Sequence, residues 1–145
     1  MLLAMRRHHY LAASPNISDT LWYVASWGEE WVALVSFSAS ALKCAARDRL
    51  IGWDFRQRYR LLKLVVNNSR FLILPEWHAP NAGSRVLAPC QRRVGRDWEA
   101  ALGQGVVWLE TFVDPERFRG RFIGRRTGSV WGTRVGFTAL TSATA

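Results

Sequence analysis

The sequence is poor in lysine and cysteine, and it contains no long apolar run. Of its 20 basic residues only Lys43 and Lys63 are lysines, so arginine carries nearly all of the positive charge. The two cysteines, Cys44 and Cys90, are isolated, and without a C-x-x-C pair the sequence indicates neither a zinc knuckle nor a redox pair. We expect free thiols in a reducing compartment.

The sequence also shows no targeting or membrane signal. No segment approaches the roughly 18 consecutive apolar residues that a transmembrane helix needs. Residues 1–5 are apolar, but arginines follow them rather than precede them, which argues against a secretory signal peptide. We therefore expect a cytoplasmic protein without membrane contact.

Apolar and positively charged residues are abundant. Of the 145 residues 49% are hydrophobic and eight are Trp, a composition typical of one packed domain. The formal net charge is +9, which favours nucleic acid as a partner because Lys and Arg neutralise phosphates. The arginines from which a contiguous binding face would be drawn are Arg47, Arg49, Arg56, Arg60, Arg92, Arg93 and Arg96.

The first half of the chain predicts a β-hairpin followed by a helix. Residues 21–25 and 31–38 are rich in aromatic and β-branched side chains and flank a glycine-containing turn. Residues 43–52 are polar and mixed, which predicts a loop with a short turn. Asp54 is placed to cap a helix over residues 54–64. The apolar stripe of that helix comprises Phe55, Tyr59 and Leu62.

The second half predicts a strand, a helix and a further strand. Residues 69–74 form a short apolar strand that Pro75 ends, and a helix begins between residues 81 and 84. Its interior Pro89 predicts a kink or a late start, because a proline inside a helix costs about 3 kcal/mol; residues 96–102 continue as a short helical piece. The apolar run 106–113 suits a central strand. The side chains expected to point inward from the helix are Val86, Leu87, Cys90 and Val94.

Four blocks of sequence resemble the DruA family of the Druantia anti-phage system. They are residues 7–11 (RHHYL), 46–53 (ARDRLIGW), 65–75 (VVNNSRFLILP) and 109–120 (LETFVDPERFRG). The resemblance covers residues 7–120 and implies a role in anti-phage defence or beside mobile elements and transposases. Other defence-system proteins or nucleic acid would be its partners. It names an association and not a reaction.

The order of elements is also similar to the N-acyltransferase fold of the GNAT superfamily. This resemblance implies an α/β (α+β) fold, with a mixed central sheet and helices on both faces. It further implies an acetyl-CoA site, in which Asn81, Gly83 and Ser84 hold the pyrophosphate at a helix N-terminus. Gly83 fits the last glycine of that motif, whereas His78 and Asn81 replace its first two signature residues.

Two groups of polar residues are candidates for chemistry. Asn67, Asn68, Ser69 and Arg70 precede an apolar strand; they either bind a carboxylate, phosphate or base edge, or form a turn with Arg70 paired to an acid. Glu110 lies within an apolar strand, where a carboxylate is costly unless it is paired or functional. It is either a general base or half of a buried ion pair, and Arg70 is the expected partner.

The adjacent residues His8 and His9 make a weak case for a metal site. Neighbouring side chains point to different sides of a helix, so the two do not chelate one ion from one face, and we expect no metal. His9 remains a candidate catalytic residue that acts near Tyr10. Asp114 is most simply a helix cap.

The segment after Gly120 departs from the family. DruA-like sequences continue there with a motif such as Thr-x-Tyr-Arg-Ala-Ala-Asn-Trp, which residues 121–128 do not contain. Codons permitted for these eight residues nevertheless read Thr-Val-Tyr-Arg-Ala-Ala-Asn-Trp once a single nucleotide is restored. We therefore expect an incomplete DruA-like domain over residues 1–120, an out-of-frame tail over 121–145, and missing or aberrant C-terminal strands.

Overall fold

A computed structural model describes residues 18–112, 130–133 and 137–140, with side chains over 18–112. In chain order the elements are β1 (Thr20–Trp27), β2 (Glu30–Ala39), α2 (Ala45–Ile51), α3 (Phe55–Leu61), the 3-10 turn η1 (Leu62–Leu64), β3 (Val65–Ile73), the 3-10 turn η2 (Pro75–Trp77), α4 (Ala82–Leu102), β4 (Trp108–Thr111), β5 (Val130–Thr133) and β6 (Phe137–Leu140). The expected mixed α/β class is confirmed.

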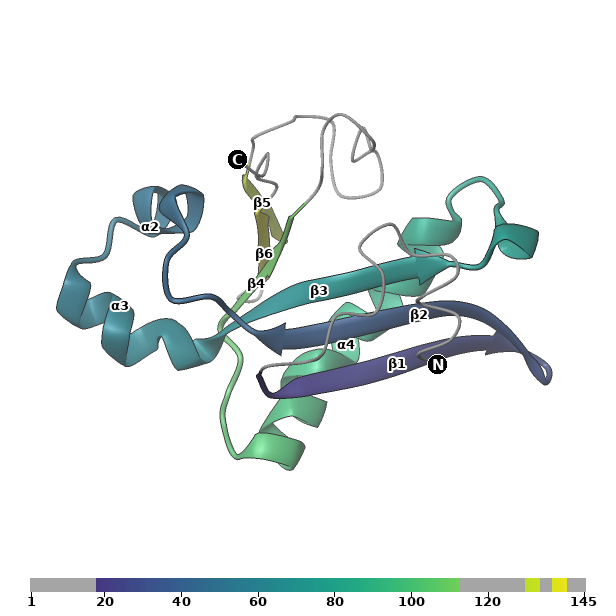
Figure 1. Cartoon of the computed structure of the whole chain (residues 1–145), viewed down its shortest axis with the longest axis horizontal. Helices are drawn as coiled ribbons and strands as arrows, with labels where there is room; N and C mark the ends of the chain where they lie inside the picture. The colour runs from purple at the N-terminus through teal and green to yellow at the C-terminus, as the bar shows by residue number, and fades with distance from the viewer. Residues whose placement is uncertain (1–17, 113–129, 134–136, 141–145) are drawn as a thin grey trace.

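The main sheet has four strands in the order β1-β2-β3-β4. The first three strands are antiparallel, and β4 runs parallel to β3. The parallel pairing joins Val65–Asn68 to Trp108–Thr111, so it covers only the first four residues of β3. In Figure 1, β4 then leaves the plane of β3 at a wide angle.

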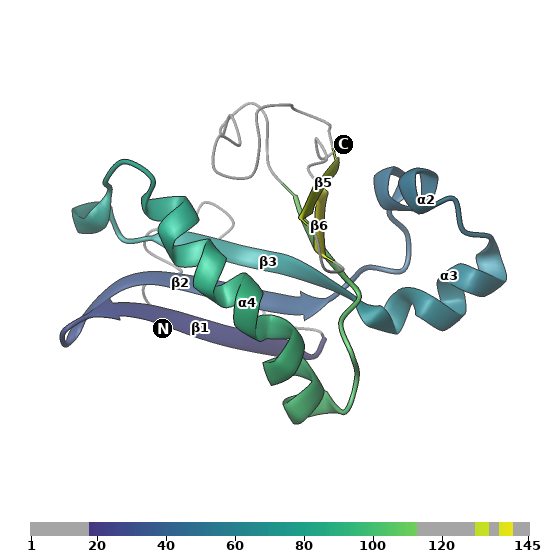
Figure 2. The ribbon, with the colours of Figure 1, turned by 180° about the vertical axis from the view of Figure 1, so that it is seen from behind.

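Helix α4 covers one face of this sheet, while α2 and α3 project from its end (Figures 1 and 2). Among the described residues α4 is the one helix that lies on a sheet face, so the expected helices on both faces are not found there. On the opposite face of the sheet, the buried side chains of Leu34 and Leu72 form a second, smaller cluster with Trp22 and Leu74.

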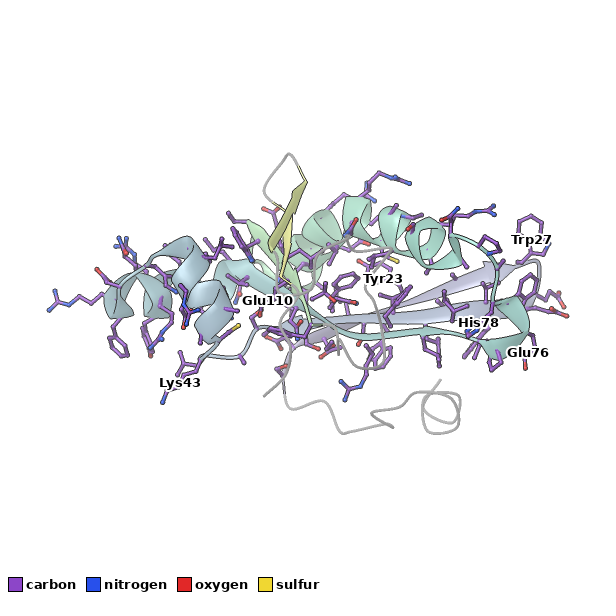
Figure 3. The ribbon with its side chains drawn as sticks, turned by 90° about the horizontal axis from the view of Figure 1, so that it is seen from above. Tyr23, Trp27, Lys43, Glu76, His78 and Glu110 are labelled. Atoms are coloured by element: carbon purple, nitrogen blue, oxygen red, sulfur yellow. The ribbon has the colours of Figure 1, made fainter. Side chains whose placement is uncertain are left out.

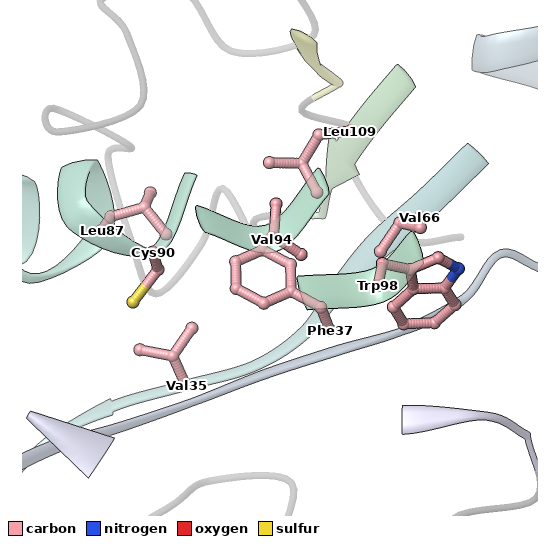
Figure 4. Packing of buried hydrophobic residues seen from close by; sticks show 8 residues of the cluster. All are labelled: Val35, Phe37, Val66, Leu87, Cys90, Val94, Trp98 and Leu109. Carbon is pink, nitrogen blue, oxygen red and sulfur yellow. The ribbon is translucent and has the colours of Figure 1, made fainter. Parts of the chain in front are cut away.

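The core lies between α4 and the sheet (Figure 4). Leu87, Cys90, Val94 and Trp98 recur every three or four residues, which places them on one stripe of the helix. They pack against the sheet residues Val35, Phe37, Val66 and Leu109. The inward positions of Leu87, Cys90 and Val94 are confirmed, and Val86 packs against the same cluster.

Pro89 does not interrupt α4, which is continuous over 21 residues. The expected late start, and the separate short helix over 96–102, are therefore wrong, whereas the expected kink at Pro89 stays a prediction. Pro89 is exposed, so its ring takes no place in the core. The hydrophobic stripe on the opposite side of the helix compensates for the hydrogen bond that the proline cannot donate.

Three further elements differ from expectation. Residues 43–52, expected as a loop, contain α2, and β3 begins at Val65 rather than at residue 69. The strand expected over 106–113 is shorter, and β4 lies at the edge of the four-stranded sheet instead of its centre. The hairpin β1–β2 is confirmed, and its turn contains Gly28 with a left-handed φ of 59°.

Strands β5 and β6 form an antiparallel pair, and β6 lies next to β4. Both strands fall within residues 121–145, the segment expected to be out of frame. That expectation concerns the reading frame of the gene, so it stays a prediction.

Candidate functional site

A buried ion pair connects α2 to β4. Arg47 Nη1 lies 3.2 Å from Glu110 Oε1 and 3.5 Å from Oε2, and both side chains have no solvent exposure. Arg47 Nη2 donates to the carbonyl oxygens of Ala41 at 2.9 Å and Leu42 at 3.3 Å. With Asp48, whose Oδ1 lies 3.3 Å from Nε, the guanidinium thus exchanges its hydration for two carboxylates and two backbone acceptors.

The expectation that Glu110 belongs to a buried ion pair is confirmed, but the expected partner is wrong. Arg70 donates to the backbone oxygen of Ser69 at 2.8 Å and contacts no acid among the described residues. In the parallel register Glu110 lies opposite Asn67, three residues before Arg70. The partner is Arg47, because α2 places this side chain beside Glu110 of β4.

The surroundings of Glu110 shift the pKa of its carboxyl upward. Burial raises the pKa of the carboxyl above its ordinary value, although the nearby Ser40 hydroxyl and the Arg47 guanidinium act in the opposite direction. Ser40 Oγ is itself buried and does not meet the geometry of a hydrogen bond. As a general base Glu110 would first have to be released from Arg47 and reached by solvent.

Asp48 extends the ion pair into a network that holds α3. Its carboxylate accepts hydrogen bonds from Trp53 Nε1 at 2.8 Å, Arg58 Nη1 at 3.0 Å and Arg47 Nε at 3.3 Å. Burial alone would raise the pKa of Asp48, but these hydrogen bonds and the charge of Arg47 outweigh burial and lower it. The Arg47 guanidinium also lies over the Trp53 ring, 5.5 Å from its centroid.

Local sequence fixes the ends of the two short helices. Gly52 ends α2 with a left-handed φ of 71° and donates its N–H to the carbonyl of Asp48. Asp54 and Gln57 then form a reciprocal capping box at the start of α3, which confirms the expected Asp54 cap. The block 46–53 is therefore an anchor that sets where α3 projects.

The surface that this anchor positions is aromatic and basic. We call residues 43–64, which include α2, α3 and η1, the basic arm. Phe55 is 68% exposed and Tyr59 is 74% exposed, one helical turn apart, so the stripe expected on α3 does not form part of the core. Arg58 lies over the Phe55 ring, 5.4 Å from its centroid.

The basic arm carries seven basic and two acidic side chains. Arg47 and Arg58 are neutralised within the network. The other five are exposed and make no ion pair within the described part of the chain; they are Lys43, Arg49, Arg56, Arg60 and Lys63. Figure 3 shows Lys43 pointing away from the sheet at the end of the molecule that carries α2 and α3.

The cluster Asn67, Asn68, Ser69 and Arg70 lies within β3, so the expected turn ahead of a strand is wrong. Asn68 Nδ2 donates to the backbone oxygens of Ser36 at 3.0 Å and Arg70 at 3.2 Å, next to an irregularity in the β2–β3 register. The Ser69 hydroxyl lies 2.8 Å from that of Ser36 and 2.7 Å from that of Ser38. Asn68 and Ser69 thus join neighbouring strands, while Asn67 Oδ1 is buried and has no hydrogen-bond partner among the described residues.

The candidate pyrophosphate residues lie at the other end of the molecule. Asn81 precedes α4 with a left-handed φ of 61° and offers no side-chain cap; Gly83 is buried, and Ser84 is half-buried in the first turn. Figure 3 shows His78, in the loop before α4, toward the same end of the molecule as Trp27 and far from Glu110. The structure therefore does not bring these residues together with Glu110.

Some candidate residues lie outside the described part of the chain, namely His8, His9, Tyr10 and Asp114. Within the described residues, no group of three or more His, Cys, Asp or Glu side chains is arranged to hold a metal ion. In the same part of the chain, no helix is long and apolar enough to span a membrane. Arg47 is buried and therefore cannot belong to the nucleic-acid-binding face that was expected from seven arginines.

A model of the family described as "Druantia protein DruA" matches residues 2–139. The chain belongs to the DruA family. This membership associates it with Druantia defence, and the match continues past Gly120. No curated protein and no solved structure matches the chain.

Sequence reasoning missed Asp48, Arg58, Tyr59 and Lys63 as members of a candidate site. The signal for Asp48 was present in the DruA block 46–53, where an Arg-Asp pair precedes a glycine and a tryptophan. The signal for the others was the excess of basic over acidic residues between 43 and 64. The arginine face expected from the sequence includes Arg56 and Arg60 from this segment but not Arg58 or Lys63.

Proposed function

We propose that this DruA protein acts in Druantia-type defence by binding nucleic acid, and that the basic arm is its contact surface. The observation that supports this proposal is the group of five exposed cations on the arm that make no ion pair with the described residues. Cations whose charge is not neutralised within the fold are free to neutralise phosphates. The anchor at Arg47 and Asp48 keeps these cations on one projecting element.

Such binding is expected to depend strongly on salt. Each neutralised phosphate releases condensed counterions, so five contacts give a logarithmic salt slope of about −4.5 for duplex DNA and about −3.5 for single strands. Binding through apolar contacts alone would show little dependence. The salt slope therefore counts the phosphates that the arm contacts.

The test compares two triple variants of equal charge. Arg56→Gln/Arg60→Gln/Lys63→Gln removes three cations from the basic arm, and Arg85→Gln/Arg92→Gln/Arg96→Gln removes three exposed cations from α4. Fluorescence anisotropy with a labelled oligonucleotide, between about 50 and 200 mM salt, gives affinity and slope. The arm variant should lower the steepness of the slope by about 2 to 3, and the α4 variant should change it less. An equal effect of both variants, or no binding at all, would contradict the proposal.

A second candidate function is acyl-CoA-dependent N-acyl transfer. It is supported by the brief parallel pairing of β3 with β4, from which β4 then diverges, and by helix α4, which begins at Ala82 after the segment that follows β3. In that function Asn81, Gly83 and Ser84 hold the pyrophosphate of acetyl-CoA. Calorimetric titration with acetyl-CoA tests it, and the absence of binding heat at millimolar ligand would exclude it.

Cellular context completes the proposal. The described cysteines Cys44 and Cys90 are free thiols, which fits the reducing cytoplasm expected from the sequence. Other proteins of the defence system would act beside this chain. The basic arm leaves the outer surface of α4 and the tip of the β1–β2 hairpin available for contact with them.

A further inference from the structure

A cavity of about 250 Å³ opens beside the basic arm, between α3, the end of the sheet and the segment that follows α4. Tyr59, Leu62 and Lys63 line it from the arm, and Ser40 and Gln104 line it from the two other sides. Its volume lies below the roughly 300–1,000 Å³ typical of drug-sized ligands. A flat group of one or two rings suits it better than a whole cofactor.

The lining combines apolar walls with polar groups that lack partners. Leu62 and the indole of Trp98 provide apolar surface. The Gln104 amide and the Asp19 carboxylate make no side-chain hydrogen bond or ion pair with the described residues, whereas the Ser40 hydroxyl lies beside Glu110. An amide offers both a donor and an acceptor, and a carboxylate accepts from an amino group, which are the pairings that base edges require.

We propose that this cavity receives an unpaired nucleobase, so that the partner of the basic arm is single-stranded nucleic acid. This inference rests on the proposed function and names its ligand. Tyr59 lines the cavity and is 74% exposed, so its ring is available to stack on a base at the mouth. Lys63 lies at the same mouth, where it neutralises the adjoining phosphate.

The rest of α3 continues the site along a strand. Phe55 lies one helical turn from Tyr59 and is likewise exposed, and Arg56 and Arg60 stand beside these rings in the sequence. Grooves that bind single-stranded nucleic acid combine aromatic rings with cations. The rings stack on bases of any sequence, and the cations lie along the phosphate backbone. A base within a duplex has its edges paired and its faces covered, so it cannot enter the cavity.

The charge of the lining fixes which part of a nucleotide enters. Among the described residues Asp19 is the one acid that lines the cavity, and it repels a phosphate at that point. The base therefore enters, and the phosphate stays outside near Lys63 and Arg60. A free nucleotide would occupy the cavity alone and gain nothing from Phe55 or Arg56, so the exposed remainder of α3 favours a strand.

The test uses Tyr59→Ala, with Tyr59→Phe and Trp27→Ala as controls. Tyr59 is mostly exposed, so its truncation spares the fold, and Trp27 is an exposed aromatic residue on the distant hairpin. Anisotropy is measured with a labelled single strand and with the same sequence as a duplex, and a nucleoside monophosphate and polyglutamate serve as competitors. Tyr59→Ala should weaken single-strand binding roughly five- to a hundredfold and leave duplex binding within about twofold. Tyr59→Phe and Trp27→Ala should bind the single strand within about twofold of the parent.

The outcomes separate this inference from the proposed function. If the triple variant of the arm weakens binding but Tyr59→Ala does not, the arm binds nucleic acid and the base pocket is wrong. If Tyr59→Ala weakens the binding of duplex and of single strand equally, the partner is not specifically single-stranded. If the monophosphate alone competes as well as the strand, the cavity is a nucleotide site, and if polyglutamate does so, the arm is a surface for acidic proteins.

Discussion

Arg47 holds a full positive charge at a position without solvent exposure, and Glu110, Asp48 and two backbone oxygens replace its hydration. Removing one member of such a pair leaves the other charge buried alone. We predict that Arg47→Met lowers the free energy of unfolding by about 3 to 5 kcal/mol, measured by urea denaturation. The matched control Arg49→Met, on the exposed side of α2, should stay within about 0.5 kcal/mol of the parent.

A double variant keeps that prediction testable if Arg47→Met alone fails to fold. Arg47→Met/Glu110→Leu removes both charges and replaces them with apolar groups, a change that is often neutral or stabilising. The double variant should therefore recover most of the stability that Arg47→Met loses. Equal destabilisation by the single and the double variant would mean that packing, and not the isolated charge, sets the cost.

Glu110 also gives the protein a specific dependence on pH. Burial raises its pKa in the folded state above the ordinary value of 4.5, so the folded state binds the proton more tightly than the unfolded state does. The stabilisation that Glu110 contributes is present in full at pH values below its ordinary pKa. It is lost as the pH rises through the pKa that Glu110 has in the folded state. Urea denaturation over this window should show the parent losing stability relative to Glu110→Gln as pH rises. A difference between the two proteins that stays constant with pH would contradict this mechanism.

Asp48 contributes in the opposite sense and in a different window. Its folded pKa is lowered below the ordinary 3.8, so its contribution is lost as pH falls through the folded value. Glu110→Gln retains Asp48, and the comparison above therefore cancels this term. Sequence alone identified Glu110 as a group that needs a partner, but not Asp48, which lies in the segment 43–52 expected to be a loop and whose partners Trp53 and Arg58 lie five and ten residues further along the chain.

At the scale of elements, α4 tolerates a proline in its interior because its opposite face is well packed. Pro89 removes one backbone hydrogen bond and lies on the exposed side of the helix, outside the core cluster. We predict that Pro89→Ala raises the free energy of unfolding by up to about 3 kcal/mol, measured by urea denaturation. Arg92→Ala, at an exposed position of the same helix, is the control and should change stability by less than about 0.5 kcal/mol. No gain from Pro89→Ala would mean that the local backbone already compensates for the proline.

The sequence predicted elements well where one periodicity extends over many residues. The hairpin and the inward face of α4 follow from alternation and from the three- and four-residue spacing of Leu87, Cys90 and Val94. Helix α2 was missed because its seven residues are too few for a periodic signal, and ion pairs hold it more than apolar packing does. The stripe of Phe55 and Tyr59 was real, but periodicity shows that residues share a face and not whether another element covers that face.

At the scale of the whole molecule, the positive charge divides into functional and structural parts. Arg47 and Arg58 serve the fold, whereas the remaining cations of the basic arm and the exposed arginines of α4 add to the field around it. Net charge predicted a partner class from composition alone. It could not predict which arginines are free, because that depends on which acids the folded chain brings beside them.

The tail gives the last prediction, since two lines of evidence oppose each other there. Permitted codons restore the family motif over residues 121–128 in another frame, whereas the family match runs to residue 139 and β6 lies next to β4. If the tail is out of frame, a chain with the restored motif should unfold more cooperatively and at a higher temperature than the present chain in calorimetry. The coding sequence checks the same point directly, because codons that cannot yield the motif when shifted exclude the hypothesis. Equal melting of both chains would instead make β5 and β6 genuine strands of a domain that uses its own C-terminal sequence to cover the edge of β4.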